Sequence, residues 1–305
     1  MPMQEPAFLP MPPSPHPAVG WAFTLRGGGV SQGPWGVHEP GRSPEVAAKP
    51  TGMAPGGLNL GLRTGDDLSA VRENRRCVAA AIGHPVSWLT QVHGIRVLDL
   101  DETGKAHGVV SGANLHHHDP EADAQITTLP GIALAVQVAD CLPVLLADTQ
   151  GRVIGAAHAG WRGLAAGVLE VTVQAMRSKV PDANLVAWLG PCIGPAAFEV
   201  GDDVRAAFLA DTPDAATAAI QPPDPVMPGV IQPISAASAF QPRRGLGKWL
   251  ANLPLLARLR LQALGITTIH TAGHCTFSEP EHFWSYRRST PCGRMAGLLW
   301  TKTRC

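Results

Sequence analysis

The chain has 305 residues, and its 24 basic and 24 acidic side chains give a formal net charge of zero. This balance gives no electrostatic reason to expect a nucleic-acid or anionic-membrane partner, and an apolar content of 45% excludes an intrinsically disordered chain. The six cysteines are scattered without a Cys-x-x-Cys pair, the N-terminus lacks a signal-peptide pattern, and no apolar run is long enough to span a bilayer. We therefore expect a soluble cytoplasmic protein.

The N-terminal third of the chain combines loops with a few short regular elements. Residues 1–20 are rich in proline and are expected to form a disordered or extended tail. Residues 21–26 have the alternation of a strand, whereas the proline and glycine content of residues 33–57 indicates a long surface loop. The elements expected next are a helix over residues 71–82, capped by Asp66, Asp67 or Ser69, and short strands at 86–92 and 95–100, separated by His93 and Gly94.

The centre of the chain carries the clearest pattern. Three apolar runs predict neighbouring strands, at residues 132–139, 142–147 and 153–157. The elements expected after them are a helix over 164–180, a strand at 186–189, a short helix at 204–209, an insertion loop over 211–243, a helix over 250–264, a strand at 266–271 and an apolar run at 295–300. Because strands and helices intermix throughout, we expect an α/β fold with mixed sheets.

Polar side chains follow three of the predicted strands at the point where each strand ends. Asp140 and Cys141 follow one central strand, His158 follows another, and His93 interrupts an earlier strand-like run. Ligand sites in α/β proteins gather at strand ends, and Cys141 and His158 are separated by only a hairpin. Two histidines and one cysteine would form a three-ligand zinc site with one open position, as catalytic zinc sites have.

Each of these residues also has a simpler interpretation. A single cysteine after an apolar strand is commonly a small buried side chain, and a histidine beside a glycine is commonly a turn residue. Arg162, Arg287 and the adjacent Arg288 are candidates for binding phosphate, with surface ion pairing as the alternative. The histidines at 116–118 are expected to be solvated, and the glycines at 27–29 lack the lysine of a phosphate-binding loop.

A series of short motifs occurs in order along nearly the whole chain. They are residues 24–31 (TLRGGGVS), 58–61 (LNLG), 91–94 (QVHG), 123–127 (DAQIT), 139–143 (ADCLP), 158–163 (HAGWRG), 190–194 (GPCIG), 198–201 (FEVG), 275–276 (CT), 285–288 (SYRR) and 293–295 (GRM). Together they resemble the YfiH-like, laccase-domain family of purine nucleoside phosphorylases, formerly described as multicopper polyphenol oxidases. The resemblance extends from about residue 21 to residue 300 and leaves out only the proline-rich tail.

The resemblance implies a four-layer α/β/β/α sandwich with mixed sheets, in which residues 21–305 form one catalytic domain with loop insertions at 33–57 and 211–243. It implies zinc, with copper as the alternative metal, bound by His93, Cys141 and His158. It further implies phosphorolysis of adenosine, inosine, guanosine and methylthioadenosine, with adenosine deamination as a side activity. The residues then expected to be catalytic are Cys141, His158, Asp140 and Arg162, and those expected to bind substrate are Arg26, Asn59, Gln91 and Arg287.

One departure from the family pattern falls in the late helix. The family commonly has Asp-Leu there, with Asn four residues after the Leu, whereas this chain has Asn252, Leu253 and Ala257. Two other functions stay open at this point. One is copper-dependent phenol oxidation, although the twelve histidines lack the repeated His-x-His pairs of a true multicopper laccase. The other is a non-enzymatic, zinc-bearing module that binds a nucleotide.

Overall fold

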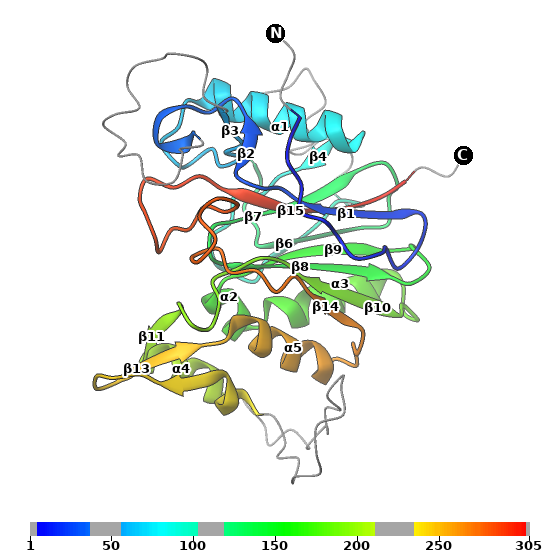
Figure 1. Ribbon diagram of the computed structural model, residues 1–305. Coiled ribbons are helices and arrows are strands. Elements are labelled where there is room, and N and C mark those ends of the chain that lie inside the picture. The colour runs from blue at the N-terminus through cyan, green and yellow to red at the C-terminus, as the bar shows by residue number, and fades with distance from the viewer. Residues whose placement is uncertain (1–4, 37–55, 103–118, 211–234, 303–305) are drawn as a thin grey trace.

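Two mixed β-sheets form the centre of the molecule, and α-helices lie on the outer sides (Figure 1). The computed structural model describes residues 5–36, 56–102, 119–210 and 235–302. These residues contain five α-helices and four sheets, with four, six, three and two strands. Both large sheets contain parallel and antiparallel pairs, which confirms the expected α/β class with mixed sheets.

The four-stranded sheet joins segments from distant parts of the chain. Its strands, in spatial order, are β1 (Val19–Phe23), β15 (Met295–Thr301), β7 (Ala133–Val138) and β4 (Val86–Ser87). Helix α1 (Leu68–Ile82) covers the outer face (Figure 1), and its buried Val78 shares a core with Trp88 and Leu298. This helix starts three residues before the expected position because the Asp67 carboxylate accepts a hydrogen bond from the Ser69 N–H at 2.9 Å.

The six-stranded sheet carries the predicted central strands. Its order is β14 (Ile269–Thr271), β10 (Leu185–Leu189), β8 (Leu142–Asp148), β9 (Ile154–Ala159), β6 (Ala124–Thr127) and β5 (Val97–Asp99). Alternate side chains of β8 face opposite sides, as strand geometry requires. Leu145 packs with Leu134 and Met295 of the other large sheet, whereas Val144 and Leu146 pack in the core beneath the helices.

The helix expected over residues 164–180 is two helices. Helix α2 (Trp161–Ala166) ends at Gly167, which has a φ of 99°, and α3 (Val168–Lys179) begins directly after it. A left-handed backbone conformation is accessible to glycine and interrupts the helical hydrogen bonds, so the break falls at this residue. Val168, Val173 and Met176 of α3 pack against the six-stranded sheet in the same core as Val144.

Residues 198–210 and 235–263 fold beside the six-stranded sheet (Figure 1). It contains β11 (Glu199–Gly201), α4 (Asp202–Leu209), a 3-10 turn (Ala236–Ala239), β12 (Phe240–Pro242), β13 (Lys248–Ala251) and α5 (Leu253–Ala263). Helix α5 starts later than expected because residues 248–251 pair in β13 and Asn252 caps the helix by accepting the Leu255 N–H at 3.0 Å. Of the expected loop 211–243, residues 211–234 lie outside the described part of the chain.

The proline-rich N-terminal segment, described from residue 5 onward, packs beside β1, which agrees with the extended alternative and corrects the expectation of disorder for this part. Leu9 is only 8% exposed, and its N–H donates to the Phe23 carbonyl at 2.9 Å. The Trp21 Nε1 donates to the Pro12 carbonyl at 3.0 Å. Proline favours extended backbone, so a proline-rich segment can follow a sheet edge and still bury the apolar side chains between its prolines.

Two shorter segments complete the description. Strands β2 (Gly27–Gly29) and β3 (Gly56–Gly57) pair with each other, and a 3-10 turn (Gly33–Trp35) opens the expected loop 33–57. Residues 37–55 of that loop and the histidines at 116–118 lie outside the described residues. Among the helices that the structure describes, none combines the length and apolar character needed to cross a bilayer.

Candidate metal centre

Three side chains predicted to bind metal meet at one edge of the six-stranded sheet. His93 lies in the turn between β4 and β5, Cys141 immediately precedes β8, and His158 lies near the end of β9. The hairpin register places Pro143 opposite His158, which brings Cys141 to the histidine. One ligand atom from each of the three residues lies within 4.8 Å of the others, and the His93 Nε2 is 3.7 Å from the Cys141 Sγ.

These distances and donor atoms fit a zinc ion. Zinc binds thiolate at about 2.3 Å and imidazole at about 2.1 Å, so two such ligands of one ion lie less than about 4.4 Å apart. The observed separation of 3.7 Å between Cys141 and His93 is within this limit. Copper favours the same donors, so the donor set admits either metal. Zinc sites with three protein ligands leave a fourth position for water or substrate.

Gly160 keeps the space between the three side chains open. A methyl group at this position would lie 2.9 Å from His93 Cδ2, 3.1 Å from Cys141 Sγ and 3.6 Å from His158 Cε1. Any residue with a Cβ would therefore press against His93 and Cys141 and would touch His158. The glycine ends the strand that carries His158 and begins α2, so the open space is a consequence of the local sequence His158-Ala-Gly160.

Burial and the charges on neighbouring side chains shift the pKa values of Cys141 and His158. Burial alone would raise the pKa of Cys141, but the His158 charge and hydrogen bonds from both histidines lower this pKa to about 6. Burial alone would lower the pKa of His158, but the Cys141 charge and the Asp123 carboxylate raise this pKa to about 9. Both shifts favour a thiolate on Cys141 and a proton on His158, and a histidine must give up its second proton to bind a metal.

Asp123 was not among the residues predicted for the site, yet it contacts both histidine segments. Its carboxylate is fully buried and accepts a hydrogen bond from His158 Nδ1 at 2.8 Å. It also accepts the backbone N–H groups of Val92, His93 and Gly94, at 3.2, 2.9 and 2.7 Å. A signal was present in the sequence, since Asp123 opens one of the family motifs directly before the buried strand β6.

Asp140, predicted to be catalytic, holds a later segment of the chain against the metal centre. Its carboxylate accepts hydrogen bonds from Thr276 Oγ1 at 2.6 Å and from the Arg287 N–H at 2.7 Å. Its own backbone is left-handed, with a φ of 93°, a conformation that costs about 1–3 kcal/mol in a residue other than glycine. The Asp140 carboxylate thus ties residues 276 and 287 to the segment that carries Cys141.

The arginines fall into two groups. Arg287 and Arg162 are exposed: the Arg287 guanidinium donates to the Glu199 carbonyl at 3.0 Å, and the Arg162 guanidinium stacks on the Trp161 ring. Arg26 and Arg288 instead hold loops together. Arg26 donates to the carbonyls of residues 36 and 280, and Arg288 donates to the carbonyls of residues 276, 277 and 283. The guanidinium of Arg288 thus bonds backbone carbonyls, where a surface ion pair was the expected alternative to phosphate binding.

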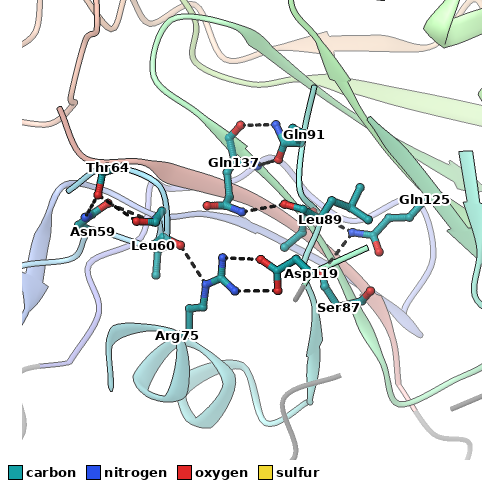
Figure 2. A network of polar contacts seen from close by, with 12 residues as sticks. Asn59, Leu60, Thr64, Arg75, Ser87, Leu89, Gln91, Asp119, Gln125 and Gln137 are labelled. Carbon is teal, nitrogen blue, oxygen red and sulfur yellow. Dashed lines mark hydrogen bonds and ion pairs between the residues drawn. The ribbon is translucent and has the colours of Figure 1, made fainter. Parts of the chain in front are cut away.

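Two amides predicted to bind substrate have partners within the protein (Figure 2). Asn59 is fully buried, and its amide donates to the side chains of Thr64 and Asp66 at 2.8 and 2.9 Å. Gln91 is partly exposed, and its amide pairs with the backbone N–H and carbonyl of Gln137, both at 2.7 Å. Gln91 thereby attaches the segment before His93 to β7.

The departure in the late helix is also explained by packing. Ala257 lies on the buried face of α5 and is fully enclosed in the core beneath the six-stranded sheet. Asn252 caps the start of the same helix. A polar side chain at position 257 would need a buried hydrogen-bond partner in this core, and alanine avoids that requirement.

Comparison with known proteins gives a consistent relationship across the whole chain. A family profile described as multi-copper polyphenol oxidoreductase laccase matches residues 20–302. A purine nucleoside phosphorylase from Pseudomonas aeruginosa is 40% identical over 290 residues, which cover 95% of this chain and 96% of that protein. The purine nucleoside phosphorylase YfiH from Escherichia coli is 42% identical over 245 residues, or 80% of this chain and 86% of that protein.

Solved structures agree with these relationships. The crystal structure of a Neisseria meningitidis protein has a TM-score of 0.74 and 39% identity, and covers 97% of this chain and 99% of its own. YlmD from Geobacillus stearothermophilus has the same TM-score of 0.74 at 24% identity, covers 99% of both chains, and shows the shared fold alone. The chain therefore belongs to the multi-copper polyphenol oxidoreductase laccase family, among the relatives of YfiH.

Proposed function

We propose that this protein is a zinc-dependent purine nucleoside phosphorylase, which transfers the ribosyl group of a purine nucleoside to inorganic phosphate. The observation that carries the proposal is the 40% identity, over 95% of the chain, to a relative named for that activity. The cluster of His93, Cys141 and His158 supports it, because these residues offer a three-ligand set with an open position. A bound zinc would supply a Lewis acid that polarises a substrate group or a water molecule at this position.

The reaction requires phosphate beneath the ribose and stabilisation of charge as the purine departs. The bond from C1′ to the purine nitrogen breaks with its electron pair on the purine, and a phosphate oxygen forms the new bond to C1′. Positive charge develops on the ribose, so fixed charges around it matter more than a strong nucleophile. The exposed guanidinium of Arg287, anchored through Asp140, is the group we assign to phosphate, with Arg162 as a second candidate.

The finer details of the proposal come from the family resemblance. They are a substrate range of adenosine, inosine, guanosine and methylthioadenosine, and a side activity that deaminates adenosine. Deamination needs an activated water to attack C6 of the purine, which suits a three-ligand zinc site. The proposal also places the protein in the cytoplasm as one catalytic domain over residues 21–305, with the layers ordered α/β/β/α. The packing of the two large sheets through Leu134 and Leu145 supports that order.

The test is to incubate the purified protein with inosine, with and without phosphate, and to identify the products by chromatography. The proposal expects hypoxanthine and ribose 1-phosphate, formed only when phosphate is present. Cleavage without phosphate would identify a hydrolase, and no cleavage of any purine nucleoside would favour a nucleotide-binding module. Arg287→Ala should raise the KM for phosphate about tenfold, as expected for a lost charge-assisted hydrogen bond. Arg244→Ala, an exposed arginine outside the site, is the matched control.

A second function follows from the family description, which names a multi-copper oxidoreductase. The same three ligands would bind copper, and copper generally binds such donors more tightly than zinc. Reduction of oxygen to water by true laccases uses four coppers, so we expect slow phenol oxidation that depends on added copper. Rapid phenol oxidation at one copper per chain would favour the oxidase over the phosphorylase.

A further inference from the structure

We propose that Asp123 is a positioning residue that holds both metal-binding histidines in place through one buried carboxylate. The proposal rests on the metal centre of the proposed function, but not on the identity of the substrate. It assigns to Asp123 the orientation of the His158 ring and the conformation of the turn that carries His93. Metal affinity should therefore depend on a residue that does not itself touch the metal.

The first step is the orientation of His158. Its Nδ1 lies 2.8 Å from Asp123 Oδ1, so this nitrogen donates its proton to the carboxylate. The Nε2 is then the nitrogen left to face Cys141 and His93 and to bind a metal. Carboxylates that accept the second N–H of a ligating histidine fix the ring and increase its basicity, and their loss typically reduces metal affinity about 10–100-fold.

The second step is the turn around His93. This residue has a φ of 64°, a left-handed conformation that is unfavourable for a residue with a Cβ. The three successive N–H groups of residues 92–94 converge on the Asp123 carboxylate, at distances between 2.7 and 3.2 Å. Such a concave set of backbone donors binds an anion, and here the anion is supplied by the protein itself. Asp123 therefore offsets the strain of the His93 turn.

The third step is the sharing of oxygens, which explains why a carboxylate is needed. Oδ1 accepts from the His93 N–H and from His158 Nδ1, whereas Oδ2 accepts from the N–H groups of Val92 and Gly94. Four donors thus meet two acceptor atoms. An asparagine would replace one oxygen with an NH₂ group, which would face at least one N–H donor in either orientation. Because both histidines share Oδ1, a displacement of one is transmitted to the other.

The decisive experiment compares the wild type with Asp123→Asn and Asp148→Asn. Asp148 is an equally buried aspartate at the far end of β8, where it bonds Arg152 and the Asn184 N–H. Each protein is stripped of metal and titrated with Zn²⁺ against a competing chelator, and its unfolding is followed in parallel. We expect the Kd for Zn²⁺ to rise about 10–100-fold in Asp123→Asn and to stay at the wild-type value in Asp148→Asn.

The results separate positioning from general stability. Wild-type zinc affinity in a folded Asp123→Asn variant would overturn the proposal, as would an equal loss in Asp148→Asn. If Asp123→Asn does not fold, the ¹⁵N spectrum of the zinc-loaded wild type decides instead. A proton on His158 Nδ1 supports the proposal, and a proton on Nε2 overturns it. Since zinc binding is the readout, the result stands independently of whether the protein cleaves inosine.

Discussion

Gly160→Ala should weaken metal binding without unfolding the protein, because the added methyl group would touch all three ligands. Gly160 has a φ of −63°, which alanine adopts freely, so the substitution introduces no backbone strain. The side chains around Gly160, however, leave too little room for a methyl group. The new Cβ would lie 2.9 Å from His93 Cδ2 and 3.1 Å from Cys141 Sγ.

The size of the effect follows from these two distances. Carbon atoms in van der Waals contact are about 3.5–4.0 Å apart, so the His93 ring at 2.9 Å must retreat by at least about half an ångström. Metal–ligand bonds tolerate deviations of about 0.2 Å. We therefore expect the Kd for Zn²⁺ to rise at least about tenfold. This is the lower end of the loss in metal affinity that follows removal of a residue that orients a metal ligand. The metal-free variant should be as stable as the wild type. Alanine adopts this φ without strain and lowers the conformational entropy of the unfolded chain, which favours the folded state.

The assay is a Zn²⁺ titration of the metal-free protein with a chelating indicator, paired with a thermal melt. Gly201→Ala is a matched control, because Gly201 also precedes a helix and has a permitted φ of −89°. A methyl group there would meet only the end of the exposed Asp203 side chain within 4 Å. Unchanged zinc affinity in Gly160→Ala, or an equal loss in Gly201→Ala, would refute the steric argument.

Three further predictions address the ligands, the N-terminal segment and acid stability. Cys141→Ala should abolish stoichiometric zinc binding, measured by metal analysis, whereas Cys77→Ala in α1 should retain the metal. Leu9→Ala should lower the free energy of unfolding by about 2 kcal/mol in urea titrations, and no change would mean that the segment is not docked in solution. Burial opposes ionisation of Asp148, but its hydrogen bonds to Arg152 lower its pKa below the usual value. The ionised carboxylate therefore stabilises the folded protein above about pH 4, and this stabilisation is lost at lower pH. Asp148→Asn should therefore cost about 2 kcal/mol at pH 7, and the difference from wild type should shrink by pH 3.

The proximity of His93, Cys141 and His158 could be expected from the sequence. The apolar runs that predict β8 and β9 also define where those strands end, and ligand-binding side chains gather at such an edge. The contribution of Asp123 was not predicted, because it depends on a contact between β6 and the turn at His93. Periodicity describes which face a residue occupies, but it does not say which distant N–H groups reach that residue.

Other differences have the same origin in tertiary contacts. The docking of Leu9 depends on the edge provided by β1, which the composition of a proline-rich segment does not reveal. Asn59 occupies a motif typical of the family, yet the structure uses its amide to bond Thr64 and Asp66. In contrast, the helix break at Gly167 had a local signal in the sequence, a glycine within an otherwise continuous helical pattern.

The position of β15 has a consequence for how this chain folds during synthesis. The strand Met295–Thr301 lies between β1 and β7, so two of its neighbours are made long before it is. Until it leaves the ribosome, both strands expose unpaired edges, the kind of surface that invites aggregation or chaperone binding. The three residues of the candidate metal cluster lie between positions 93 and 158 and are translated much earlier. All of them are therefore synthesised before the four-stranded sheet can close.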